Sequence, residues 1–309
     1  MRGVSEKEAV FTVKGLVLRV TDVGESDRML TVLTAEEGKL SVWARGVRKL
    51  TSSGLSSAQL FSYANFTLRR GRDRCFFREA NALEMFHGIT ASVEGNALAT
   101  YLCELADEIA YPGGESPALL QLTLNALWAI AQGTHPLYII KGAYELRAAA
   151  IAGFMPDLFS CTACEKQAID GPSMLDVANG RVFCGPCYEE LFLKPREVLS
   201  PREQSEPERD TTDTPLVWES VMEGTLLAMR YILYTGAKRQ FSFTVPERDE
   251  KNFARVCERY LLHHIGHGYK SLSFYKSLDD TENELFQSIA AIQKARAAKQ
   301  HETEEQPST

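Results

Sequence analysis

Four cysteines in two closely spaced pairs are the residues of this sequence whose chemistry is easiest to assign. Cys161 and Cys164 form the first pair, Cys184 and Cys187 form the second, and 19 residues separate the pairs. Two residues between thiols let both sulfurs point inward from one tight turn, and two such turns supply four thiolates for a tetrahedral Zn²⁺. The spacing therefore predicts one structural zinc ion in a small lobe.

Other uses of these cysteines fit the sequence less well. Redox-active Cys-x-x-Cys is expected beside a βαβ pattern, ferredoxin spacings differ from this one, and catalytic zinc keeps a ligand position open. The sequence has no His-Glu-x-x-His, deaminase, nucleotide-loop or Gly-x-Ser-x-Gly motif, so it predicts no enzyme. We expect Cys75, Cys103 and Cys257 in the core, since each falls on an apolar face.

The first 80 residues carry an excess of positive charge. They hold 14 Lys and Arg against 9 Asp and Glu, a balance of +5, although the whole chain is at −7. Cations that track phosphates, beside an aromatic ring that stacks on a base, suit single-stranded nucleic acid. The alternative is a solvated barrel face with Phe76 in the core, and Trp43 equally suits the barrel interior. The predicted binding residues are Arg45, Arg48, Lys49, Arg69, Arg70, Arg72, Arg74 and Phe76.

The elements that must position these residues change type along the chain. Strand patterns fill residues 8–80, with the last two strands at Gln59–Arg70 and Arg72–Glu79, and five strands of this length suit a small closed barrel. From residue 83 the apolar spacing is helical. The predicted class is therefore α+β, with an N-terminal five-stranded barrel, a helical domain and a four-Cys lobe.

Composition shifts mark the domain boundaries. A Pro-rich, charged stretch follows the cysteines, helical patterning returns at Leu216–Leu233, and a last helix is expected at Glu282–Lys299. His263, His264 and His267 lie at a helix end, where C-caps and cations are favoured over a metal site. The predicted divisions are 1–80 (nucleic-acid-binding barrel), 81–156 (first helical part), 157–194 (zinc lobe), 195–215 (linker), 216–300 (second helical part) and 301–309 (disordered tail).

The composition also excludes several classes of protein. Apolar residues make up 44% and charged residues 24%, as in ordinary globular chains, which excludes collagen-like, disulfide-rich and disordered classes. No apolar run approaches the length of a membrane span, and Lys14 and Arg19 interrupt the only candidate for a signal sequence. We expect a soluble, cytoplasmic protein.

Several segments together resemble one family. Near the start the chain reads GESDRMLTVLTAEEGKLSVWARGVRK and then LFSYANFTLRRGRDRCFFREA. Further on it reads YELRAAAIAGFMPDLFSCTAC, NGRVFCGPC and YLLHHIGHGYKSLSFYKSL. These segments are similar to the bacterial DNA repair protein RecO family, whose N-terminal barrel is an OB-fold. The stretch Pro195–Pro215 is more polar than the family's usual connection, and the helix after residue 281 is an addition.

The resemblance implies a non-enzymatic recombination mediator of the bacterial nucleoid. Such a protein binds single- and double-stranded DNA, anneals complementary strands and contacts the acidic tail of the single-stranded DNA-binding protein (SSB). With its partner RecR it helps to load the RecA recombinase; no membrane or small-molecule substrate is implied. The family's basic barrel surface maps onto Arg45, Arg48 and Lys49, and the zinc ligands onto the four paired cysteines. The competing hypotheses are a zinc-stabilised protein-interaction scaffold and a zinc hydrolase or thiol oxidoreductase.

Overall fold

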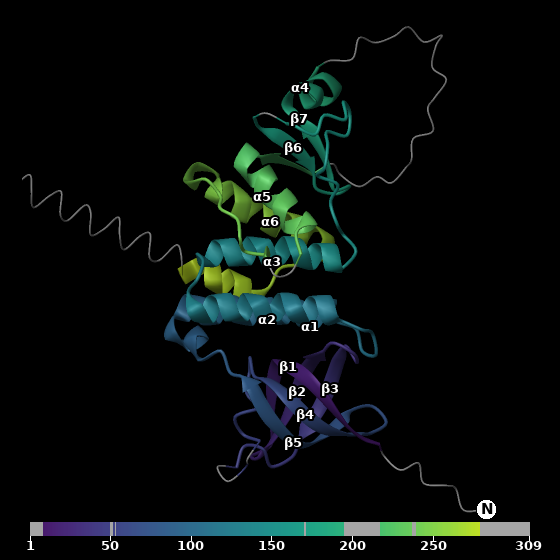
Figure 1. Ribbon diagram of the computed structural model, residues 1–309, viewed down its shortest axis with the longest axis vertical. Coiled ribbons are helices and arrows are strands. Elements are labelled where there is room, and N and C mark those ends of the chain that lie inside the picture. The colour runs from purple at the N-terminus through teal and green to yellow at the C-terminus, as the bar shows by residue number, and fades with distance from the viewer. Residues whose placement is uncertain are drawn as a thin grey trace, which may run out of the picture.

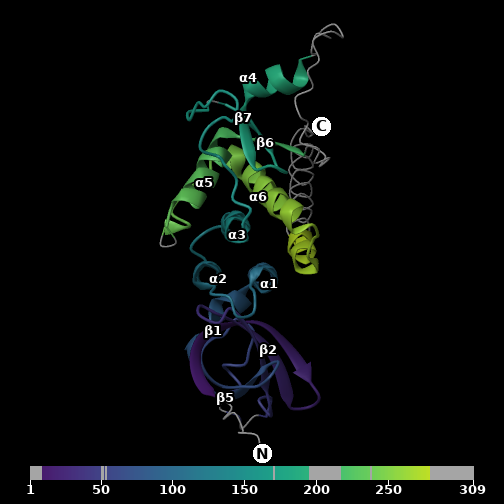
Figure 2. The same ribbon diagram turned by 90° about the vertical axis from the view of Figure 1, so that its right-hand side faces the viewer.

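The computed structural model describes residues 9–49, 52, 54–169, 171–194, 217–236 and 239–278. The molecule is elongated, with a barrel at one end, helices in the middle and the cysteine-bearing sheet at the other end (Figures 1 and 2). The predicted linker, the predicted helix at 282–299 and the tail lie outside the described residues. No helix in the described ranges is long and apolar enough to cross a bilayer.

The N-terminal strands close into a barrel in the order β1-β2-β3-β5-β4, with β4 pairing back onto β1. β3 and β5 run parallel, and the other neighbouring pairs are antiparallel. This arrangement confirms the predicted five-stranded OB-fold. The strands are β1 (Val10–Val23), β2 (Asp27–Thr34), β3 (Lys39–Ala44), β4 (Tyr63–Arg70) and β5 (Cys75–Glu84).

The middle of β1 is buried on both faces. Val13 and Val17 belong to the barrel core, whereas Leu16 and Leu18 belong to the core of the helical body. The pairing register with β2 shifts between Val17 and Arg19, as at a β-bulge. β1 therefore joins the barrel to the helices.

The last two barrel strands begin later than predicted. β4 starts at Tyr63 rather than Gln59, and β5 starts at Cys75 rather than Arg72. Phe61 has a φ of 67°, outside the range of a strand, and its side chain is buried in the helical core. The start of the predicted strand is therefore a turn at Phe61, which is held in place because the Phe61 side chain packs into the helical core.

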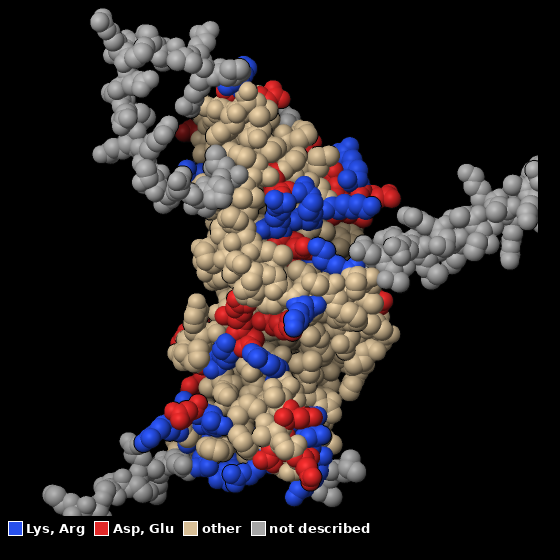
Figure 3. Space-filling view, turned by 180° about the vertical axis from the view of Figure 1, so that it is seen from behind, with Lys and Arg blue, Asp and Glu red and all other residues tan. Residues whose placement is uncertain are grey.

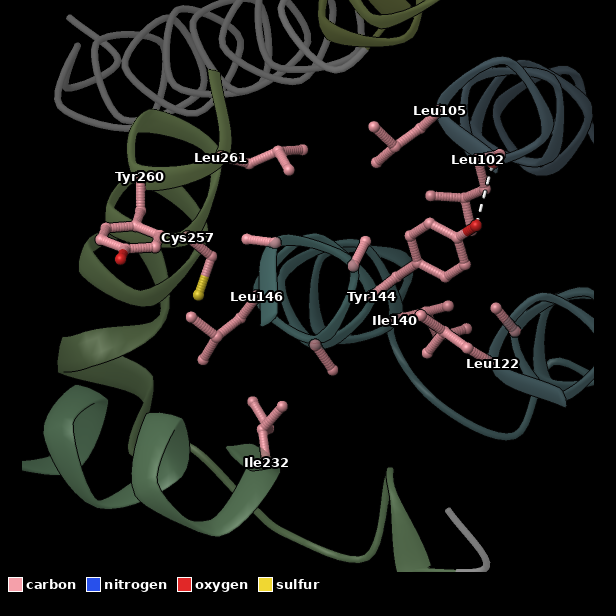
Figure 4. Close-up of a cluster of buried hydrophobic side chains, with 14 of the residues drawn as sticks. Leu102, Leu105, Leu122, Ile140, Tyr144, Leu146, Ile232, Cys257, Tyr260 and Leu261 are labelled. Atoms are coloured by element: carbon pink, nitrogen blue, oxygen red, sulfur yellow. Dashed lines mark hydrogen bonds between the residues drawn. The ribbon is translucent and has the colours of Figure 1, made fainter. Parts of the chain in front are cut away.

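The helical body is layered around α3. The hydroxyl group of Tyr144 on α3 donates a hydrogen bond to the carbonyl oxygen of Leu102 on α1 at 3.1 Å. Figure 4 shows Tyr144 on the side of α3 that faces Leu122, and Leu146 on the side that faces Cys257. Apolar side chains on opposite faces of α3 thus pack against the neighbouring helices. The helices are η1 (His87–Ala91), α1 (Val93–Ile109), α2 (Pro117–Gln132), α3 (Leu137–Ile151), α5 (Glu223–Tyr234), η4 (Glu247–Asp249), α6 (Glu250–Ile265) and a helical segment at 270–278.

The cysteine lobe contains a three-stranded sheet in the order β7-β6-β8. β6 (Ser173–Asp176) and β7 (Arg181–Cys184) form a hairpin, and α4 (Gly185–Tyr188) and a π-helical turn, η2 (Glu189–Leu193), follow it. β8 (Trp218–Val221) is a correction, because the sequence predicted helix from Leu216. The helix, α5, begins only at Glu223. Antiparallel pairing of β8 with the distant β6 overrides the local helical pattern.

Two buried carboxylates connect the three parts of the molecule. Asp107 on α1 binds both Arg19 on β1 and Lys39 on β3. Glu219 on β8 binds Arg255 and Arg259 on α6. Each acid has two cationic partners, as a buried carboxylate needs, so barrel, helices and cysteine lobe are held in a fixed arrangement.

Candidate nucleic-acid interface and metal centre

The four paired cysteines come together at the end of the β7-β6-β8 sheet. The four sulfur atoms all lie within 4.8 Å of one another, and Cys164 Sγ is 3.8 Å from Cys184 Sγ. A zinc ion with four Zn–S bonds of about 2.3 Å places its sulfurs about 3.8 Å apart. This donor set therefore fits a tetrahedral metal ion.

Two backbone turns position the thiols. In the first, the Cys161 N–H donates to the Lys166 carbonyl oxygen at 2.9 Å, and the Glu165 N–H donates back to the Cys161 carbonyl oxygen at 2.8 Å. In the second, Cys184 ends β7 and Cys187 lies within α4. The hairpin thus carries one pair of thiols to the other, as the spacing predicted.

The electrostatics around Cys161 favour a thiolate. Burial opposes ionisation, but backbone N–H groups of Cys184, Cys164 and Ala163 point at the sulfur and lower the pKa of Cys161 to about 6. A thiolate is the form that ligates a metal ion. Four sulfur ligands would close the shell of a bound metal ion, which is the arrangement typical of structural rather than catalytic sites.

On the barrel, three side chains from neighbouring strands form a row. Trp43 on β3 lies opposite Phe76 on β5, and Phe76 lies opposite Arg69 on β4. The Arg69 guanidinium sits 4.4 Å from the centre of the Phe76 ring, and the Arg74 guanidinium sits 5.4 Å from the centre of the Trp43 ring. Phe77, the next residue along β5, packs inward against the barrel core instead.

This row, the Trp43–Phe76–Arg69 row, lies outside the barrel core. Trp43 and Phe76 are partly exposed on the outer face of the barrel, so neither fills its interior. Aromatic rings that are held between guanidinium groups and reach solvent are suited to stacking with bases.

The loop after β3 continues this surface. Asp27 accepts hydrogen bonds from the Trp43 indole at 3.2 Å and from the Gly46 N–H at 2.8 Å. The bond from Gly46 is the largest cause of the lowered pKa of Asp27. Arg45 and Lys49 are exposed and form no salt bridge within the described chain. Arg48, by contrast, turns to Asp22, 3.4 Å away, so its charge is partly neutralised.

The remaining predicted arginines line a cleft of about 460 Å³ between the barrel and the loop after α1. Arg70 contacts the Phe11 ring and pairs with Glu37 at 2.9 Å, whereas Arg72 and Arg74 make no salt bridge to a described residue. Arg74 also reaches Trp43, so the cleft and the aromatic row are continuous. The structure thus brings most of the predicted residues onto one surface.

Two cations of this cleft, Arg19 and Lys39, were missed from the sequence. Neither belongs to a cluster of basic residues along the chain, and only barrel closure brings them beside Arg72. No local sequence signal marks them as part of this surface, because Arg19 follows four consecutive buried positions of β1 and Lys39 is only partly exposed.

Comparison with known proteins agrees with these features. Residues 9–86 match the family model described as "Recombination protein O N terminal", and residues 91–191 match "Recombination protein O C terminal". A DNA repair protein RecO from Desulforudis audaxviator is 38% identical over 179 residues, covering 58% of this chain and 71% of that protein. One from Acetivibrio thermocellus is 26% identical over 266 residues, covering 86% of this chain and 96% of that protein.

The chain belongs to the RecO family of DNA repair proteins. The predicted resemblance is therefore confirmed. The N-terminal match contains the whole barrel with its basic surface, and the C-terminal match contains all four paired cysteines. The two candidate sites of this RecO-family chain thus both lie in the parts that the family shares.

Residues that the sequence assigned to structural roles lie where expected in this RecO-family chain. Cys75, Cys103 and Cys257 are buried in the cores. His264 stacks on the ring of Phe154, with 4.7 Å between ring centres, and His267 contacts Glu108 at 2.9 Å. Their surroundings are those of helix-end packing.

Proposed function

We propose that this chain binds single- and double-stranded DNA, anneals complementary strands and, with RecR, helps to load the RecA recombinase onto DNA coated by SSB. The observation that carries the proposal is the Trp43–Phe76–Arg69 row beside exposed cations on the barrel. Annealing requires two polyanions to approach each other. Cationic side chains lower that repulsion, while the aromatic rings hold bases unpaired and accessible.

We further propose that the four cysteines hold one Zn²⁺ with a structural role, and that the protein is not an enzyme. Zinc bound by Cys161, Cys164, Cys184 and Cys187 would cross-link the two turns of the lobe. The partners in this proposal are DNA, the acidic tail of SSB, and RecR. The competing function is a zinc-stabilised protein-interaction scaffold.

An annealing assay tests the proposed function directly. Complementary oligonucleotides, one with a fluorophore and one with a quencher, are first coated with SSB and then mixed with or without this protein. We expect strand pairing to accelerate at least tenfold with the protein. A protein that is folded and binds SSB but neither binds DNA nor accelerates pairing would support the scaffold instead.

A further inference from the structure

A second basic surface lies on α6, at a distance from the barrel. Arg248 lies in η4, two residues before α6 begins, and Lys251, Arg255 and Arg259 follow it at steps of three, four and four residues on one face. All four side chains are exposed. Figure 3 shows Lys and Arg side chains gathered on this face of the helical body, above a mixed acidic and basic group nearer the barrel. We call these four residues the α6 basic stripe.

The positive charge of the α6 basic stripe exceeds the negative charge beneath it. Arg255 and Arg259 share one carboxylate, that of Glu219, which is only 4% exposed and lies below them. Lys251 forms no salt bridge within the described chain, and Arg248 lies 3.7 Å from the buried Asp249. Only two carboxylates, both buried, form salt bridges with these four cations within the described chain. The guanidinium groups are also fixed in place, so less side-chain entropy is lost when they bind an anion.

Other acids on this helix are directed elsewhere. Glu258 binds Lys141 and Lys276, each at 2.7 Å, and so offsets two different cations. Glu250 bonds to the Tyr138 hydroxyl. Glu247 also lies near Tyr138. Within the described chain, no salt bridge joins Glu247, Glu250 or Glu258 to a residue of the α6 basic stripe.

The shape of this surface indicates the kind of ligand. Side chains four residues apart on a helix are separated by a rise of about 6 Å, so the stripe presents charges at regular intervals along a line. None of the described clefts is lined by Lys251, Arg255 or Arg259. Arginine clusters recognise acidic peptides as well as phosphates. The regular line of cations favours a phosphate backbone, whose charges also repeat at regular intervals and which needs only a row of cations.

The α6 basic stripe is separated from the barrel surface by the α1–α3 layer (Figures 1 and 2). On α1, between the two surfaces, lie Glu104 and Glu108, which are exposed, and Asp107, which already neutralises Arg19 and Lys39. A single polyanion that ran continuously from one surface to the other would cross this acidic region. The two basic surfaces are therefore suited to separate strands.

We infer that the α6 basic stripe binds the phosphate backbone of a second nucleic acid strand while the barrel holds the first. This inference rests on the proposed function, because it assigns the second of the two strands that annealing requires. Binding here is independent of base sequence, since cations that contact the phosphate backbone carry no sequence information.

The test uses the full chain with Arg248→Glu and Lys251→Glu, which leave both partners of Glu219 in place. Glutamate in the first turn of a helix is compatible with the helix dipole, so the fold is retained. The control is Lys166→Glu with Lys194→Glu, an equal change of charge at exposed positions of the cysteine lobe. Each protein is bound to an immobilised oligo-dT too short for two chains, and capture of a second, labelled oligo-dT is measured.

We expect the wild type and the control to capture the second strand. The Arg248→Glu/Lys251→Glu protein should capture it about tenfold more weakly, with its affinity for the first strand within twofold of wild type. Equal capture by variant and control would overturn the inference while leaving the barrel site standing. The inference would also be overturned if the Arg248→Glu/Lys251→Glu protein still captured the second strand but no longer bound an acidic peptide. If the wild type binds no first strand, the proposed function itself fails.

Discussion

At the residue scale, the placement of Trp43 decides between two readings of the barrel. From the sequence, alternation along the strand put Trp43 and Arg45 on one face but did not show which face was outside. The register with Phe76 and Arg69 shows that this face is the outer one. A short strand with a partly exposed aromatic residue has no local feature that separates a stacking site from a core position, so the distinction needed the tertiary structure.

Replacing the rings by Trp43→Ala or Phe76→Ala should each weaken binding to a single-stranded oligonucleotide by about 1–3 kcal/mol, or roughly 5- to 150-fold. The salt dependence of binding should not change, because no charge is removed. Fluorescence anisotropy at several salt concentrations measures both quantities. Trp128→Ala is the control, since Trp128 is more exposed than Trp43 but lies on α2. Equal losses in Trp43→Ala and Trp128→Ala would rule out stacking at the barrel.

A buried carboxyl group in the helical body should make stability depend on pH. Glu145 is fully buried on α3, where it accepts from the Tyr101 hydroxyl at 2.9 Å and from Lys141 at 3.1 Å. Burial outweighs the attraction of Lys141 and raises the pKa of Glu145 from 4.5 to about 7. The folded state therefore holds this proton more tightly than the unfolded state does.

The contribution of Glu145 to stability is fully present below pH 4.5 and is lost as pH rises through about 7. The free energy of unfolding of the wild type, relative to that of Glu145→Gln, should accordingly fall between these two pH values. Urea unfolding at a series of pH values measures it. Glu94→Gln, a substitution at a partly exposed position in the first turn of α1, should show no such trend relative to wild type. If the free energy of unfolding of the wild type, relative to that of Glu145→Gln, increased with pH, the raised pKa of Glu145 would be contradicted.

At the scale of elements, the sequence predicted most of the strands and helices because their signals are local. The hairpin of β6 and β7 was marked by Asn179-Gly180 between two apolar runs, and α2 by Pro117 at its start and Gly133 at its end. The failure was β8. Its pairing partner β6 lies more than 40 residues earlier in the chain, and four residues are too few to show strand alternation against a helical run.

Removing the metal should unfold the cysteine lobe and leave the barrel intact. The wild type should carry one metal ion per chain by native mass spectrometry, and Cys164→Ser or Cys187→Ser should carry none. Without it, backbone amides of β6 and β7 should lose protection from hydrogen exchange, since the metal holds their turns together. Amides of β1 and β4 should stay protected. Cys75→Ala, a buried cysteine outside the cluster, should keep its metal; metal loss there, or unchanged exchange in Cys187→Ser, would contradict this role.

At the scale of the whole molecule, fewer of the barrel's positive charges are unpaired in the structure than the charge count of the sequence implied. Several barrel cations are neutralised by acids: Arg28 and Arg48 by Asp22, and Arg70 by Glu37. Asp107, 88 residues from Arg19 in the chain, neutralises Arg19 and Lys39 from another domain. Ion pairs between distant residues are invisible to a count of charges. The sequence therefore located the basic domain but did not separate its paired cations from its unpaired ones.

Four predicted binding residues, Arg45, Lys49, Arg72 and Arg74, form no salt bridge within the described chain and remain exposed. They border the Trp43–Phe76–Arg69 row and the cleft beside it. We expect these four to contribute most of the electrostatic attraction for a nucleic acid backbone. Arg48 and Arg70, which already have carboxylate partners, should contribute less.

The most direct test of the account is the salt dependence of oligonucleotide binding by the variant with alanine at these four positions. The slope of log affinity against log salt should decrease in magnitude by about 3 relative to wild type, because each phosphate contact on a single strand contributes about 0.7. The control is the Lys166→Ala/Lys194→Ala protein, which should keep the wild-type slope. A quadruple variant that is folded and retains both the affinity and the slope of the wild type would contradict the assignment of the barrel as the nucleic-acid-binding surface.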